Sequence, residues 1–194
     1  TNCVKHDLTS MFFGCSDLLP MWIADMDIAI PDFICDAVKK RAEHPVYGYS
    51  FFGESYFTNF INWMQKRHGL KIEKEWICFS PGVVPALNMS VLTYSQPNDK
   101  VIIQPPVYPP FFNAVTDHGR LLTENHLKLK GENYVMDIDK LESQIDADTK
   151  MLILCNPHNP VGRAWTKKEL SALLTLCEKH HIILVSDEIH SDFI

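Results

Sequence analysis

Four short segments of the sequence combine glycine, proline and polar residues in patterns that could bind a ligand. Each follows an apolar run typical of a buried strand, and ligands of parallel α/β sheets bind beyond the carboxyl ends of the strands. Together the segments offer backbone amides for a phosphate, polar side chains for the edge of a ring, and an aromatic surface for stacking. They are residues 80–84, 104–108, 156–162 and 186–190.

Residues 80–84, Ser-Pro-Gly-Val-Val, lie immediately before a helical pattern. Gly82 permits a close approach of the backbone, and the open amides of a first helical turn can bind a phosphate. The segment is not a G-x-x-x-x-G-K-[ST] loop, so the sequence does not favour binding of a nucleoside triphosphate. A plain strand-to-helix turn is the alternative interpretation.

Residues 156–162, Asn-Pro-His-Asn-Pro-Val-Gly, contain two Asn–Pro steps. Each step restricts the backbone before its proline to extended conformations. A loop stiffened in this way could hold an asparagine amide against a ligand oxygen. The alternative is an ordinary turn, because asparagine, proline and glycine are the usual turn residues.

Two further segments carry a carboxylate and an aromatic ring. Asp187, after an apolar strand pattern, could accept a hydrogen bond from a protonated ring nitrogen and keep that ring charged; alternatively it is the N-cap of a helix. His190 could be an ordinary surface histidine. Tyr108 lies among four prolines and could stack on a flat cofactor, or it could be a core tyrosine.

The surrounding apolar patterns predict the elements that would position these segments. Thr166 and Glu169 form a predicted capping box at the start of one helix. Strands without polar alternation, separated by amphipathic helices, indicate an α/β fold with a mostly parallel sheet covered by helices on both faces. Helical patterns occupy residues 31–41, 56–64, 83–94, 111–117, 138–145 and 166–177, strand patterns occupy 76–79, 101–103, 151–155 and 182–185, and 121–129 is mostly extended.

The composition is that of a globular protein. Of the 194 residues, 46% are hydrophobic and 22% charged, which argues against disorder, and the net charge of −6 without a basic run argues against a nucleic-acid partner. The sequence has no apolar run long enough for a membrane span and no signal-peptide pattern, so we expect a cytoplasmic protein. Its six cysteines form no C-x-x-C pair, and we expect reduced thiols and no metal site.

Taken together and in this order, the segments resemble one family, the fold-type I pyridoxal-phosphate enzymes of the aspartate aminotransferase superfamily (class I/II). Within it, the chain is similar to the cystathionine β-lyase, or C-S lyase, branch called MalY/PatB. The resemblance covers nearly the whole chain. The segments that carry it are residues 22–27, 48–49, 80–90, 103–112, 155–162 and 186–194.

The resemblance implies pyridoxal 5′-phosphate as the cofactor and assigns roles around its ring. Asp187 matches the aspartate that pairs with the pyridine nitrogen, which makes the ring a better sink for electrons. Asn159 matches the donor to the phenolic oxygen. Tyr108 matches the stacked tyrosine and is the candidate catalytic residue. His190 stands where aminotransferases usually carry tyrosine, as in the lyase branch, so the hydrogen bond to the phenolic oxygen could be altered.

The resemblance also implies a phosphate site, a homodimer with shared active sites and a substrate segment. Gly82, Val83 and Val84 match the turn whose amides hold the phosphate, and Tyr49 matches the tyrosine that reaches the phosphate of the partner subunit. The residues expected to meet the substrate carboxylate are Ile23 and Ala24.

The same resemblance implies a domain organisation. Residues 1–45 would belong to the small domain, and residues 46–194 would be the N-terminal portion of the large cofactor domain. The Schiff-base lysine and the arginine for the substrate carboxylate are expected beyond Asp187, and no lysine of this sequence lies in the matching context. We therefore expect an excerpt, incomplete at its C-terminus, that is inactive by itself.

For the whole enzyme the implied reaction is α,β-elimination on cystathionine or a related sulfur amino acid, which yields a thiol, pyruvate and ammonia. A pyridoxal-phosphate aminotransferase is the first alternative, because the same residues hold the same cofactor. A regulator that acts through a protein partner is the second. Residues 22–27 and His190 favour the lyase over the aminotransferase.

Overall fold

The computed structural model describes residues 2–194. The chain divides into two compact units, and the boundary in the sequence falls between Gly53 and Glu54. The first unit contains three helices, α1 (Val4–Asp7), α2 (Thr9–Phe13) and α3 (Asp32–Ala42). α3 confirms the helix predicted from the apolar spacing that begins at residue 31. The expected domain boundary between residues 45 and 46 stays a prediction.

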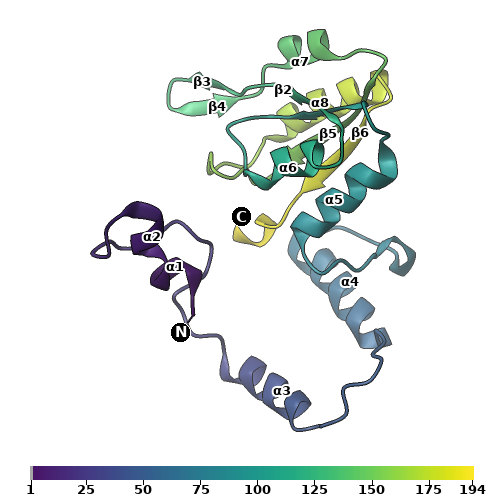
Figure 1. The fold of residues 1–194 in the computed structure, drawn as a ribbon. Coiled ribbons are helices and arrows are strands. Elements are labelled where there is room, and N and C mark those ends of the chain that lie inside the picture. Colours follow the sequence, from purple (N-terminus) through teal and green to yellow (C-terminus); the bar gives the residue numbers. More distant parts are fainter. Residues whose placement is uncertain (1) are drawn as a thin grey trace. The chain divides into compact units, whose positions relative to one another are not determined.

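The second unit alternates helices and strands (Figure 1). Its helices confirm the predicted positions to within a few residues, and β4 has no predicted counterpart. In chain order the elements are α4 (Glu54–His68), the 3-10 turn η1 (Lys74–Trp76), α5 (Val83–Tyr94), β1 (Lys100–Ile103), α6 (Pro110–Thr116), β2 (Leu121–Glu124), β3 (Lys128–Lys130), β4 (Asn133–Val135), α7 (Ile138–Gln144), β5 (Thr149–Cys155), α8 (Lys167–Lys179), β6 (Ile183–Asp187) and the 3-10 turn η2 (Ser191–Phe193).

Four strands form a parallel sheet in the order β2-β1-β5-β6, which confirms the predicted fold class. β5 pairs with β6 from Met151↔Ile183 to Cys155↔Asp187, so both strands end at the same edge. β3 and β4 form a separate antiparallel hairpin. The carboxyl ends of β1, β5 and β6 therefore lie along one edge of the sheet, and this edge positions the candidate site.

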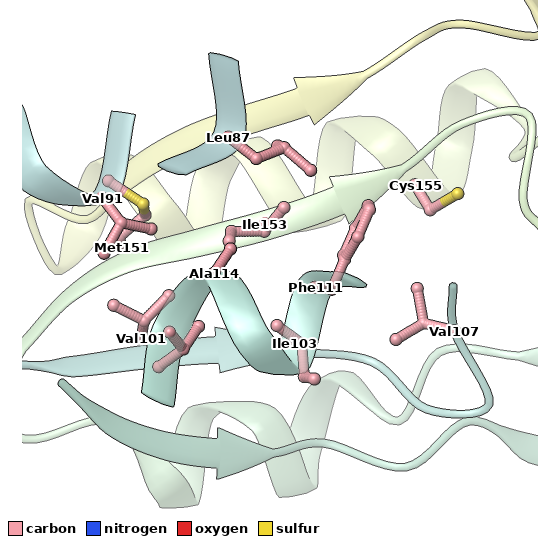
Figure 2. Packing of buried hydrophobic residues seen from close by; sticks show 11 residues of the cluster. Leu87, Val91, Val101, Ile103, Val107, Phe111, Ala114, Met151, Ile153 and Cys155 are labelled. Carbon is pink, nitrogen blue, oxygen red and sulfur yellow. The ribbon is translucent and has the colours of Figure 1, made fainter. Parts of the chain in front are cut away.

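Each face of the sheet is covered by its own apolar cluster. Ile153 and its neighbours at alternate positions of β1 and β5 pack with α5 and α6 (Figure 2). Ile102, Leu152 and Leu154 point to the other face, where they pack with α7 and α8. Because successive side chains of a strand alternate between faces, continuous apolar strands supply both layers at once.

The predicted capping box begins α8. The hydroxyl of Thr166 accepts from the backbone N–H of Glu169 at 3.3 Å, and the Glu169 carboxylate accepts from the Thr166 amide at 2.8 Å. Two otherwise unbonded amides of the helix start are thereby satisfied.

The prediction of a strand at residues 76–79 is wrong. Trp76 ends η1, and Ile77 has an extended backbone at φ −91° and ψ 113°. Residues 77–79 carry no strand pairing within the part of the chain that the structure describes. An apolar sequence favours the extended backbone, but a strand also needs a neighbouring strand that bonds to it.

Other features of the described residues bear on the environment of the protein. None of the helices in residues 2–194 combines the length and the apolar character that a membrane crossing requires. The six cysteines are free thiols, and Cys155 and Cys177 among them are buried.

The core predicts the effect of a truncation at its centre. Ile153 is 1% exposed within the first cluster, so Ile153→Ala should lower the free energy of unfolding by about 2–5 kcal/mol. The matched control is Leu129→Ala, because Leu129 is 62% exposed and its loss should cost about 0.5 kcal/mol or less. Urea unfolding of both variants measures the difference. Equal losses would contradict the assignment of Ile153 to the core.

Candidate active site

The candidate site lies at the sheet edge where β1, β5 and β6 end. The segments that follow these strands are residues 104–108, 156–162 and 188–190. The backbone N–H of Asn156 donates to the carbonyl of Asp187 at 2.9 Å, which joins two of them directly. The structure thus brings together the segments that carry Tyr108, Asn159, Asp187 and His190, all within the second unit.

Asp187 is the last residue of β6, and only 7% of it is exposed. Its Oδ1 accepts from the backbone N–H of Ile189 at 3.1 Å, while Oδ2 accepts no hydrogen bond from the residues described. The N-cap alternative is wrong, because the piece that follows is the short turn η2, whose N-cap is His190. A largely buried carboxylate with one open oxygen calls for a cationic or N–H donor.

The N-terminus of α5 has no side chain that caps it. Gly82, the N-cap, has a φ of +156°, which side-chain-bearing residues rarely adopt. The first helical bond runs from the Ala86 amide to the Gly82 carbonyl at 3.2 Å, so the amides of Val83 and Val84 stay open. In Figure 2, Val91 is drawn near the start of β5 and Leu87 nearer its carboxyl end, so α5 begins at the site edge.

The loop after β5 is braced from within. The Asn156 side chain accepts from the Trp165 amide at 3.0 Å, and the Trp165 indole donates to the Cys155 carbonyl at 3.0 Å. The amide of Asn159 donates to the sulfur of Cys155 at 3.3 Å, which fixes its backbone. Its side-chain amide makes no hydrogen bond within residues 2–194 and is available for a ligand.

Cys155 remains a thiol in this setting. Burial raises the pKa of Cys155 to about 11, and the negative charge of Asp187 acts in the same direction, while the Asn159 amide opposes both. A protonated thiol can donate to the Pro157 carbonyl, which lies 3.5 Å from the sulfur. Cys155 therefore supports the loop as a neutral group, and its raised pKa disfavours the thiolate form that a nucleophile requires.

The two remaining predicted residues of this unit are partly accessible. Tyr108 is 39% exposed, and its carbonyl accepts from the Phe111 amide at 3.0 Å, which places the ring just before α6. The core-tyrosine alternative is therefore wrong for Tyr108. The ring of His190 lies 6.2 Å from that of Phe193, at an interplanar angle of 47°.

Tyr49, Ile23 and Ala24 belong to the first unit. Tyr49 is fully exposed, Ile23 is half-buried and Ala24 is exposed. The segment that carries Ile23 and Ala24 is held by Lys5, a residue that the sequence interpretation missed. The Lys5 ammonium donates to the carbonyl of Asp25 at 2.6 Å and to the carboxylate of Asp27 at 2.8 Å.

His158 is a second residue that the sequence interpretation passed over. It is 3% exposed, neither ring nitrogen has a hydrogen-bond partner in the described chain, and its ring meets that of Trp165 edge-on at 5.6 Å. Burial lowers the pKa of His158, and the positive charge of Arg163 acts in the same direction. A buried imidazole thus belongs to the loop that carries Asn159, and burial disfavours its charged form.

Comparisons with known proteins place this chain in a family. The model of the family "Aminotransferase class I and II" matches residues 31–194. The chain therefore belongs to the class I and II aminotransferases, a family of pyridoxal-phosphate-dependent enzymes.

The similar proteins include a cystathionine beta-lyase. The chain is 46% identical to cystathionine beta-lyase PatB of Bacillus subtilis over 193 residues, which cover 99% of this chain and 50% of PatB. It is 31% identical to the protein MalY of Escherichia coli, covering 100% of this chain and 50% of MalY. The crystal structure of cystalysin from Treponema denticola, which contains pyridoxal 5′-phosphate, superposes with a TM-score of 0.92 at 37% identity, covering 98% and 49% of the two chains. The chain spans about half the length of these relatives.

The buried histidine predicts how stability depends on pH. Because the pKa of His158 is held below its ordinary value of 6.5, the unfolded chain binds a proton that the folded chain does not in the interval between the two values. The free energy of unfolding should fall as the pH decreases through 6.5, by at most about 1.4 kcal/mol per pH unit.

His158→Phe keeps an aromatic ring against Trp165 and should remove this part of the pH dependence. Urea unfolding between pH 5 and pH 8 (roughly the range that histidine titrates in) measures it. His181→Asn is the control, because His181 is exposed and its side chain makes no hydrogen bond or ion pair within residues 2–194, so the dependence should stay in place. A wild-type slope retained in His158→Phe would show that His158 is not buried in its neutral form.

Proposed function

We propose that this chain forms the cofactor-binding part of a pyridoxal-phosphate-dependent C-S lyase. The enzyme would cleave cystathionine or a related sulfur amino acid by α,β-elimination to a thiol, pyruvate and ammonia. The observation that carries the proposal is Asp187, a buried carboxylate with one open oxygen at the carboxyl edge of a parallel sheet. The likeness to PatB and to cystalysin supports the choice of reaction.

The residues at this edge fit pyridoxal phosphate. The open amides of Val83 and Val84 at the start of a twelve-residue helix suit a phosphate dianion. The open oxygen of Asp187 suits a protonated pyridine nitrogen, and the unbonded side chain of Asn159 suits a phenolic oxygen. The partly exposed ring of Tyr108 suits stacking.

Bound pyridoxal phosphate would supply the electron sink for the carbanion at the substrate α-carbon. The residues of this chain would then orient and polarise the ring. Asp187 would hold the proton on the pyridine nitrogen, and Asn159 would donate to the phenolic oxygen, with His190 nearby in the turn after β6. Tyr108 would assist the elimination. The lysine and the arginine that the family resemblance places after Asp187 would complete the site in the full natural polypeptide.

A class I/II aminotransferase is the second candidate, because the matching family model covers both kinds of enzyme. Release of pyruvate from cystathionine without an added keto acid distinguishes them. A lyase forms pyruvate under these conditions, whereas an aminotransferase stops once its cofactor has accepted the amino group.

Asp187→Asn should impair catalysis far more than folding. The substitution keeps the shape of the side chain but removes the charge that stabilises the ring proton, at a cost of about 1.5–3 kcal/mol in cofactor interaction. The electron sink weakens in addition. Pyruvate release by the full natural polypeptide measures the first effect and urea unfolding the second. Turnover equal to that of the wild type would refute the role of Asp187.

The proposed homodimer predicts complementation between two inactive variants. If Tyr49 serves the phosphate of the partner subunit, a heterodimer of Tyr49→Phe and Asp187→Asn contains one site with neither lesion. Mixing the two variants, with subunit exchange verified by differential tags, should therefore restore part of the pyruvate release. Heterodimers that form without regaining activity would show that Tyr49 does not act across subunits.

A further inference from the structure

Three donors of helix α4 converge on Asp192, in the turn that follows the candidate site. The Trp63 indole N–H lies 3.1 and 3.2 Å from the two carboxylate oxygens of Asp192, and Nε2 of His68 lies 2.8 Å from Oδ1. The Arg67 guanidinium donates to the Asp192 backbone carbonyl at 2.9 Å. We call these four residues the Asp192 clamp.

The Asp192 clamp differs from an ordinary surface ion pair. A single exposed pair contributes little, because two flexible side chains must be ordered to form it. Here one short segment engages three donors of a single helix, and one of these donors, Trp63, has a stiff aromatic ring. The hydrogen bond from His68 holds the pKa of Asp192 below its usual range, with smaller contributions from Trp63 and Arg67. The carboxylate is therefore ionised at neutral pH.

Two hydrogen bonds within the turn connect the Asp192 clamp to Asp187. The amide of Ser191 donates to the Glu188 carbonyl at 2.9 Å, and the amide of Ile189 donates to the Asp187 carboxylate at 3.1 Å. Within residues 2–194, the side-chain hydrogen bonds that reach residues 190–194 from elsewhere in the chain all come from α4. The clamp thus fixes the far end of the turn whose near end orients the Asp187 carboxylate.

We propose that Trp63, Arg67, His68 and Asp192 are positioning residues for Asp187. They would not touch the cofactor; they would hold the turn so that the Ile189 amide occupies Oδ1 of Asp187 and Oδ2 remains available for the pyridine nitrogen. The inference rests on the proposed function, because it concerns the group that Asp187 would bind.

The test compares two probes in the full natural polypeptide, pyridoxal phosphate and 1-deazapyridoxal phosphate, which has carbon in place of the ring nitrogen. Trp63→Phe and Asp192→Asn should each weaken equilibrium binding of pyridoxal phosphate by about two- to tenfold. Neither should change the affinity for the deaza analogue, because that ring offers Asp187 no N–H. Trp76→Phe is the matched control, since Trp76 is 69% exposed and its indole donates no hydrogen bond within the described chain.

A second measurement needs no cofactor. Hydrogen exchange of the Ile189 amide should become faster in Trp63→Phe and in Asp192→Asn, and should stay unchanged in Trp76→Phe. An equal loss of affinity for both probes would mean that the clamp only stabilises the fold, and unchanged affinities and exchange would mean that it has no effect on Asp187. Either result overturns the inference. A wild type that binds both probes equally would instead refute the pairing of Asp187 with the ring nitrogen, and with it the proposed function.

Discussion

The parallel pairing of β5 with β6 is the interaction on which the rest of the candidate site depends. It places Asp187 opposite Cys155 and lets the Asn156 amide bond to the Asp187 carbonyl. A shift of β6 by one residue would turn Asp187 to the other face of the sheet. Such a shift is opposed by the apolar side chains of β6 itself, because Val185 packs against one cluster and Leu184 against the other. The hydrophobic core therefore determines where the carboxylate lies.

In the loop after β5, one carboxylate stabilises two neighbouring pieces of the structure. Glu169 completes the capping box of α8 and also accepts from the guanidinium of Arg163 at 2.6 Å. Arg163 in turn donates to the Tyr134 carbonyl at 2.6 Å and lies 4.5 Å from the centre of the Trp165 ring. The start of a helix and the loop that carries Asn159 are thus held by a shared group, so the loop is positioned by regular structure.

The parts of the fold that the sequence predicted are those decided by local pattern. The apolar run at residues 151–155 and the capping box at Thr166 and Glu169 need only neighbours in sequence to be recognised. The extended segment at residues 77–79 was mistaken for a strand because pairing depends on another strand and not on composition. The bonds from α4 to Asp192 join residues more than 120 positions apart, and no local pattern indicates them. The burial of His158 escaped notice for a related reason: its motif resembles a turn, and turns are usually exposed.

Several polar groups at the carboxyl edge of the sheet have no hydrogen-bond partner within the described chain, and this makes the region suitable for binding a ligand. Most of the loop backbone is satisfied internally, yet Oδ2 of Asp187, the side chain of Asn159 and the amides of Val83 and Val84 have no partner in residues 2–194. The side-chain atoms among them are not fully buried, so a ligand can replace water at these positions. A molecule with an anion at one end and a protonated ring nitrogen at the other would satisfy them together. The strands and loops that carry these groups fix the spacing between them, and this spacing determines which molecules they can bind together.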